Sequence, residues 1–269
     1  MQLIAVDIGN SSTKVAVEHT GERDRWCMET IIRGDDPYSI DLSAFEIDHE
    51  SAFWAASSVN QARQKRLEDW IRECRPNDRF HSIQEDEINL ESNVESRQQL
   101  GRDRLIAAWM AVELNDRAGP LIVVDAGTAV TIDLIDQDLV FQGGFIFAGA
   151  DSNFRQLAQS TAALPDLSGQ HRSEPLKKLG VRSLGKSTTN AIRQGVYYSQ
   201  VESIRGIVRR LSKALTAKKQ SNNQPAVYLT GGGLQGISNC FPEEWNHVPD
   251  LVLRGARSIG RRLLSELTE

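Results

Sequence analysis

The chain has 269 residues, of which 40% are hydrophobic, and its formal net charge is −5. This length can bury the cores of two modest domains, and the negative charge disfavours nucleic acid or an anionic lipid surface as the main partner. The three cysteines, Cys27, Cys74 and Cys240, are widely separated, which argues against a disulfide framework or a zinc site. The first residues lack the features of a signal peptide and no apolar run reaches membrane-spanning length, so we expect a cytoplasmic protein with no nucleic-acid or membrane partner.

The first half of the chain predicts a three-stranded meander, a fourth strand, a helix, a fifth strand and a second helix. These elements fall near residues 2–8, 12–19, 25–32, 52–57, 60–74, 80–83 and 98–115. The breaker Ala118-Gly119-Pro120 follows them. It predicts a boundary between an N-terminal domain at residues 1–117 and a C-terminal domain at residues 118–269.

The second half repeats this scheme, with three strands, a helix, a long helix, two strands and a terminal helix. We expect them near residues 121–125, 129–135, 139–146, 152–163, 187–215 and 226–229, near Leu251, and from about Ala256. Strands that alternate with helices able to cover both faces of a sheet indicate an α/β fold class.

One short pattern occurs once in each half, directly after an apolar strand. It is Asp7-Ile8-Gly9-Asn10-Ser11 in the first half and Asp125-Ala126-Gly127-Thr128-Ala129 in the second. A carboxylate can hold a metal ion, while a following glycine and small polar residues offer donors to a phosphate. Such residues also form ordinary β-turns, but a second match at the equivalent place favours function. The duplication predicts two related domains whose acidic hairpins grip one ligand, with ATP the obvious candidate.

Two further segments have both a structural and a functional interpretation. Thr230-Gly231-Gly232-Gly233 follows a predicted strand, so it is either a simple connection or a place where the backbone approaches the nucleotide. Gly101-Arg102-Asp103-Arg104 starts a predicted helix, where an aspartate is ordinary capping and arginines are usually solvated. The same four residues could instead supply a base for a hydroxyl and a charge clamp for an acidic substrate.

Together these segments resemble the type III pantothenate kinases of the actin, Hsp70 and sugar kinase superfamily. The resemblance runs nearly end to end and also rests on Ser57-Ser58-Val59-Asn60, Gly143-Gly144 with Gly149, Thr161 to Pro165, and Gly185 to Thr188 with Gly195. It implies two duplicated ribonuclease H-like (actin-like ATPase) domains, each a mixed sheet flanked by helices, with the active site in the cleft between them. It implies ATP-dependent phosphorylation of pantothenate to 4′-phosphopantothenate, the first step of coenzyme A biosynthesis, by a homodimeric phosphotransferase with an alcohol acceptor.

The resemblance also implies roles for individual residues. Asp103 would be the catalytic base, Asp7 would hold Mg²⁺ through water, and Asp125 would bind a monovalent cation, K⁺ or NH₄⁺. The residues implied to contact the substrate are Gly101, Arg102, Asp103, Arg104 and Thr188. The residues implied to bind ATP are Asp7, Ile8, Gly9, Asn10, Ser11, Ser12, Thr13, Lys14, Gly127, Thr128, Gly231 and Gly232.

The chain departs from the family pattern at Val94, where the family often has a tyrosine that contacts the substrate. Three alternatives therefore stay open. The chain could be another small-molecule kinase of the same superfamily, because a shared fold does not fix the acceptor. It could be a nucleotide-binding regulator without catalysis, or an actin-like filament protein. Retention of Asp103 argues against the regulator, and the short chain argues against the filament.

Overall fold

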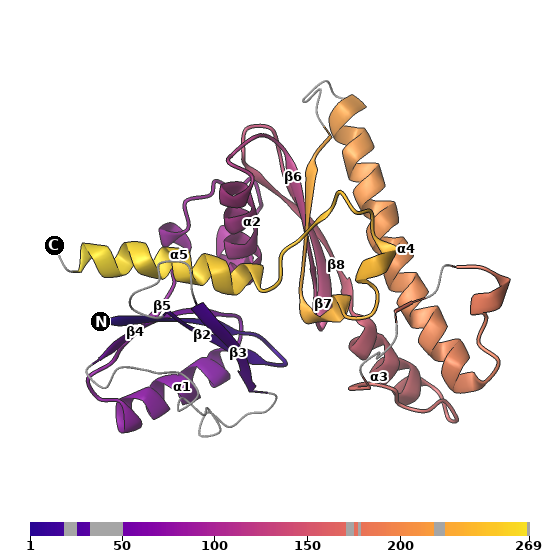
Figure 1. Cartoon of the computed structure of the whole chain (residues 1–269), viewed down its shortest axis with the longest axis horizontal. Helices are drawn as coiled ribbons and strands as arrows, with labels where there is room; N and C mark the ends of the chain where they lie inside the picture. The colour runs from indigo at the N-terminus through magenta and orange to yellow at the C-terminus, as the bar shows by residue number, and fades with distance from the viewer. Residues whose placement is uncertain (19–25, 33–50, 171–174, 177–178, 218–223, 268–269) are drawn as a thin grey trace. The chain divides into compact units, whose positions relative to one another are not determined.

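The structure is a computed structural model that describes residues 1–18, 26–32, 51–170, 175–176, 179–217 and 224–267 (Figure 1). The chain forms two compact units. The first consists of Met1–Leu90, Glu95–Met110 and Asp250–Glu269, and the second of Glu91–Val94 and Ala111–Pro249. The domain boundary expected between residues 117 and 118 stays a prediction; the compact units differ from it chiefly by joining the C-terminal segment to the first unit.

The first unit contains a five-stranded mixed sheet with the order β3-β2-β1-β4-β5. The central strand β1 is antiparallel to β2 and parallel to β4, β2 is antiparallel to β3, and β4 is parallel to β5. The strands are β1 (Gln2–Ile8), β2 (Thr13–Glu18), β3 (Trp26–Ile32), β4 (Ala52–Ser58) and β5 (Arg79–Ser82). Residues 19 and 25, at the ends of two predicted strands, lie outside the described residues.

Helices cover both faces of this sheet, as Figure 1 shows for α1 (Gln61–Cys74) and α5 (Leu251–Glu266). Because side chains alternate along a strand, even-numbered residues of β1 form one core with α1, in which Trp54 packs edge-on against Trp70. The opposite face lies against α5, where Gly260 approaches Leu3 and Ala55. Next along the chain from β5, α2 (Arg102–Leu114) packs against α5 at Gly255.

The second unit repeats the arrangement with the strand order β10-β9-β6-β7-β8. Here β6 is central, antiparallel to β7 and parallel to β9, while β7 is antiparallel to β8 and β9 parallel to β10. The strands are β6 (Leu121–Ala126), β7 (Ala129–Ile135), β8 (Phe141–Ala148), β9 (Ala226–Thr230) and β10 (Asn246–His247), and the helices are α3 (Ala150–Ser160) and α4 (Thr188–Ala217).

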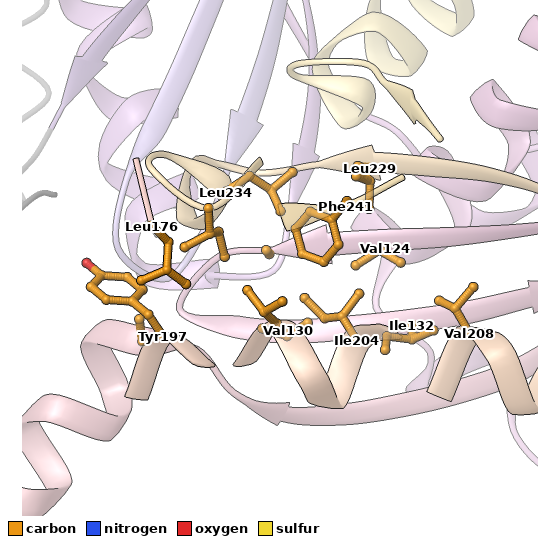
Figure 2. Packing of buried hydrophobic residues seen from close by; sticks show 14 of the residues in the cluster. Val124, Val130, Ile132, Leu176, Tyr197, Ile204, Val208, Leu229, Leu234 and Phe241 are labelled. Atoms are coloured by element: carbon orange, nitrogen blue, oxygen red, sulfur yellow. The ribbon is translucent and has the colours of Figure 1, made fainter. Parts of the chain in front are cut away.

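The core of the second unit lies between its sheet and α4. Figure 2 shows Ile204 and Val208 of α4 pointing toward Val130 and Ile132 of β7, all of them buried. Burying one such aliphatic side chain stabilises the fold by about 1.5–3 kcal/mol. The helix expected near residues 187–215 from its apolar spacing is confirmed.

The predicted α/β class is confirmed, and one predicted element is wrong. The strand expected near Leu251 is the first turn of α5, and the short strand β10 precedes it. Leu251, Val252 and Leu253 are all buried, so the apolar run has the composition of a buried strand although it opens a helix. Short 3₁₀ turns complete the described structure: η3 (Glu85–Glu87), η4 (Arg97–Gln99), η5 (Val181–Ser183), η6 (Gly232–Leu234) and η7 (Ser238–Cys240). Among the described residues, none of the helices is sufficiently long and apolar to cross a membrane.

Candidate active site

The first group of predicted site residues lies at one edge of the first sheet. Since β1, β4 and β5 are parallel, their carboxyl ends meet at the same edge, where ligands bind in open α/β sheets. Asp7 stands next to the end of β1, in register with Ser57 of β4 and Lys14 of β2. Residues in register on neighbouring strands share a face of the sheet, and for these three it is the face that α5 covers.

The turn between β1 and β2 is closed by a hydrogen bond from the Gly9 amide to the Ser12 carbonyl oxygen at 2.9 Å. Asn10 and Ser11 are exposed at its tip, where their donors can meet a phosphate. Ile8 is almost fully buried in the core that α1 covers. A contact from Ile8 to ATP would therefore have to come from its backbone.

Ser57 is a functional candidate that the sequence identified only through the family motif. Its side chain is fully buried, and its hydroxyl has no hydrogen-bond partner in the described part of the chain. Such an unsatisfied group beside a carboxylate calls for a partner that binds there, since buried polar atoms are nearly always paired. A serine at the end of a buried strand, next to the acidic strand, was the available signal.

Gly101 to Arg104 form the start of α2, as predicted. The Arg104 amide donates to Asp103 Oδ1 at 2.8 Å. The Asp103 carboxylate lies so close to Gly101 that a Cβ on Gly101 would collide with Asp103 Oδ1, so a larger residue there would displace the carboxylate. The motif thus fixes the direction of one carboxylate.

Burial raises the pKa of Asp103 above the ordinary aspartate value, and this is the largest influence on it. The Arg104 amide and the Arg104 charge act in the opposite direction, because both favour the ionised carboxylate. A pKa raised by burial is typical of a group that accepts a proton during catalysis.

Arg102 connects this helix start to the sheet. Its guanidinium donates to Ser82 Oγ and to the Ile83 carbonyl oxygen, both at 3.1 Å. Ser82 is the last residue of β5, so Asp103 is held at the same edge of the sheet as Asp7. The structure therefore places Asp103, the predicted base, on the same edge of one unit as the turn Gly9–Ser12. We call this turn, which is predicted to bind phosphate, the phosphate turn.

The second unit carries an equivalent edge. Asp125 of the central strand β6 is in register with Thr131 of β7 and Thr230 of β9. As Asp7 has Ser57 on its parallel neighbour, Asp125 has the buried Thr230. Gly231 follows with φ of +98°, a conformation that favours glycine, and a Cβ there would collide with Asp125 Oδ1.

The turn after Asp125 is held by several hydrogen bonds. The Thr128 carbonyl oxygen accepts from the Gly149 amide at 2.9 Å and from Ser152 Oγ at 2.7 Å, while the Gly127 amide donates to the Ala129 carbonyl oxygen. Gly127 and Thr128 are exposed on this fixed turn. The geometry suits a rigid contact to a phosphate.

Two other positions singled out in the sequence belong to different elements of the second unit. Thr188 is exposed at the first position of α4 and makes no side-chain hydrogen bond within the described residues. Val94, where a tyrosine was expected, lies beside Gly143 of β8 in the second unit. Its segment is fixed to β8 by hydrogen bonds between Asn93 and Phe141 and between Phe141 and Glu91.

The donors at the two edges fit the ions that the family implies. No group of three or more histidine, cysteine or acidic side chains suited to a metal occurs among the described residues. Mg²⁺ in phosphotransferases needs only one or two carboxylates, since waters and phosphate oxygens complete its shell. Asp7 beside the unsatisfied Ser57 hydroxyl meets that need. Asp125, beside the Ala126 carbonyl oxygen at Gly231, offers the oxygen donors that a monovalent cation prefers.

These features define a class of phosphotransferase with acidic strand ends in two repeated α/β units. The model of the type III pantothenate kinase family matches residues 3–210 of the chain. The chain therefore belongs to the type III pantothenate kinase family. It is accordingly an ATP-dependent kinase that acts on pantothenate in coenzyme A biosynthesis, and the predicted function and fold class are confirmed.

Individual relatives agree with this assignment. A type III pantothenate kinase of Persephonella marina is 28% identical over 261 residues, which cover 93% of this chain and 94% of the relative. Another, of Hyphomonas neptunium, is 26% identical over 97% of this chain and 99% of the relative. A crystal structure from Campylobacter jejuni, described as a candidate transcriptional activator of the Baf family, matches with a TM-score of 0.52 and 21% identity, covering 98% of this chain and 100% of that one. That likeness concerns the fold alone.

Proposed function

We propose that Asp103 is the general base that activates the 4′ hydroxyl of pantothenate for attack on the γ-phosphorus of ATP. The observation that carries this proposal is the carboxylate of Asp103, which accepts a hydrogen bond from the Arg104 amide, occupies the space beside Gly101 and has a raised pKa. It lies on the sheet edge where β1 delivers Asp7 and the phosphate turn. Alignment and charge neutralisation provide most of the acceleration in phosphoryl transfer.

In this mechanism Asp103 accepts the proton of the 4′ hydroxyl while the hydroxyl oxygen forms a bond to the γ-phosphorus. The bond from the γ-phosphorus to the bridging oxygen breaks, and that oxygen leaves on ADP. The amides of the turn at Gly9 and the turn at Thr128 bind phosphate oxygens. Asp7 would hold hydrated Mg²⁺ and Asp125 a potassium or ammonium ion, which supply positive charge to the phosphates when bound.

Arg104 is the proposed partner of the pantothenate carboxylate, since an arginine fork binds a carboxylate well. Arg102 is a weaker candidate, because its guanidinium already binds Ser82 and Ile83. From the family resemblance we also propose that Thr188 contacts the substrate. The same resemblance supports a homodimer and a cytoplasmic location. Val94 has no hydroxyl with which to hydrogen-bond the substrate, unlike the tyrosine frequent in the family. Its aliphatic side chain would give the substrate an apolar contact instead.

Substitution of the proposed base tests this mechanism. Asp103→Asn keeps the size of the side chain and should lower kcat by about 10²–10⁴-fold, the usual contribution of a general base. The dissociation constant for Mg-ATP should change little, because the phosphate turn is intact. Steady-state kinetics and isothermal titration calorimetry measure the two quantities. Near-normal turnover by a folded Asp103→Asn protein would remove Asp103 from this role.

The cation site has its own test. Asp125→Ala removes the carboxylate that we propose for the monovalent cation, so the rate advantage of potassium over sodium should disappear. Activity measured in matched potassium and sodium buffers shows this directly. A variant that keeps the full potassium dependence would assign the cation to other residues.

A further inference from the structure

Lys14, the second residue of β2 after the phosphate turn, has a partner that the sequence did not suggest. Lys14 Nζ lies 3.0 Å from Asp250 Oδ1, and the two side chains are only 21% and 14% exposed. Residues 14 and 250 are far apart in the chain, and both belong to the first unit. An ion pair that is largely shielded from water is screened by salt less than a surface pair, so this contact can fix the position of the ammonium group.

The conformation of Asp250 is unfavourable in two respects. It has φ of +57° and ψ of +42°, a left-handed conformation that costs free energy for any residue with a Cβ. It also occupies the N-cap position of α5, where aspartate usually accepts a hydrogen bond from the helix amides. Within the described residues its side chain makes no capping hydrogen bond. The carboxylate is directed to Lys14 instead.

The place of this ion pair links it to the candidate site. Lys14 is directly opposite Asp7 in the antiparallel pair β1–β2, so the two side chains share a face of the sheet. That face is the one that α5 covers, and α5 begins immediately after Asp250. Lys14, Asp7 and Asp250 therefore form a small charged group at the phosphate turn. Strained residues with a directed side chain are frequent at functional sites.

We propose that Asp250 is a positioning residue for ATP binding, which acts through Lys14. Its carboxylate holds the Lys14 ammonium at the phosphate turn and limits the attraction of that ammonium to Asp7. Without the carboxylate, the ammonium loses an anionic partner and is drawn more strongly toward Asp7. The turn then offers the nucleotide a poorly placed positive charge and a weaker hold on Mg²⁺. This inference rests on the proposed role of the turn in binding ATP.

Two substitutions separate the carboxylate from the backbone conformation. Asp250→Asn removes the charge and keeps a residue that tolerates the left-handed conformation, while Asp250→Gly removes the charge and relieves the strain. We expect both variants to raise the dissociation constant and the KM for Mg-ATP by about threefold to tenfold, as loss of a shielded ion pair would, with kcat nearly unchanged. Glu202→Gln, which breaks an exposed ion pair with Arg205 on α4, is the matched control and should change neither constant.

A double-mutant cycle with Lys14→Met identifies the route of the effect. If Asp250 acts through Lys14, adding Asp250→Asn to Lys14→Met should not weaken ATP binding further. An unchanged dissociation constant in folded Asp250→Asn and Asp250→Gly, or a fully additive loss in the double variant, would overturn the proposal. Titration of Mg-ATP needs no turnover. A protein that binds ATP without phosphorylating pantothenate would refute the proposed function while the binding comparison still decides the role of Asp250.

Discussion

A carboxyl group in the first turn of a helix usually gains from the helix dipole, but burial outweighs that gain at Asp103 and raises its pKa. The folded protein then binds a proton more tightly than the unfolded chain does. Ionised Asp103 therefore lowers stability above its folded pKa, and this cost disappears as the pH falls and the carboxyl is protonated. Such a cost is common at sites shaped for catalysis.

Asp103→Asn should accordingly raise the midpoint of thermal unfolding at neutral pH. The gain should shrink as the pH is lowered toward 4, because protonation neutralises the wild-type carboxyl as well. Thermal unfolding of both proteins at pH 7 and at about pH 3.5, below the ordinary aspartate pKa of 3.8, checks this. A variant that is less stable at pH 7, or a gain that is equal at both values, would contradict the burial of an ionised Asp103.

For individual residues, the sequence predicted the position of a functional side chain in its strand or helix better than it predicted the partner of that side chain. Asp7, Asp103 and Asp125 each stand at the strand end or helix start where their motifs placed them. The partners of Lys14 and Arg102 could not be predicted, because Asp250 and Ser82 come from distant segments. Only tertiary packing decides which long, charged side chain meets which partner.

Among the elements, α5 carries the largest difference between prediction and structure. It is the last helix in sequence but packs on β1 and β4 of the first sheet. The periodicity of its apolar residues shows one buried face and does not show which sheet that face will cover. Close approach depends on Gly260, since a Cβ there would lie 2.6 Å from Ala55 Cβ and 2.8 Å from Leu3 Cδ1.

A pair of glycine substitutions tests this packing. Gly260→Ala should destabilise the protein by about 1–3 kcal/mol through overpacking of α5 on the sheet. Gly206→Ala is the matched control in α4, where a Cβ has open space, and it should stabilise by about 0.5–1 kcal/mol through helix propensity. Urea unfolding measures both. Equal stabilisation by the two variants would show that α5 does not lie this close to β1 and β4.

At the scale of the whole molecule, the internal duplication is the feature that the sequence predicted most completely. Each sheet has a central strand ending near an aspartate, an antiparallel neighbour that forms the next turn, and a parallel neighbour with a hydroxyl residue in register. Strand patterns and the repeated acidic turn were sufficient for this. The identity of the acceptor could not come from the fold, because one fold serves many kinases; it came from the order of the family's motifs and from the family match over residues 3–210.

As a member of its family, this chain transfers phosphate from ATP to the 4′ hydroxyl of pantothenate. The most direct measurement is a coupled ADP-release assay with purified protein, Mg-ATP and potassium, in which pantothenate is compared with glycerol, glucose and acetate. We expect turnover with pantothenate alone. Turnover of another acceptor, or ATP binding with no turnover of pantothenate, would show that this chain is not a pantothenate kinase.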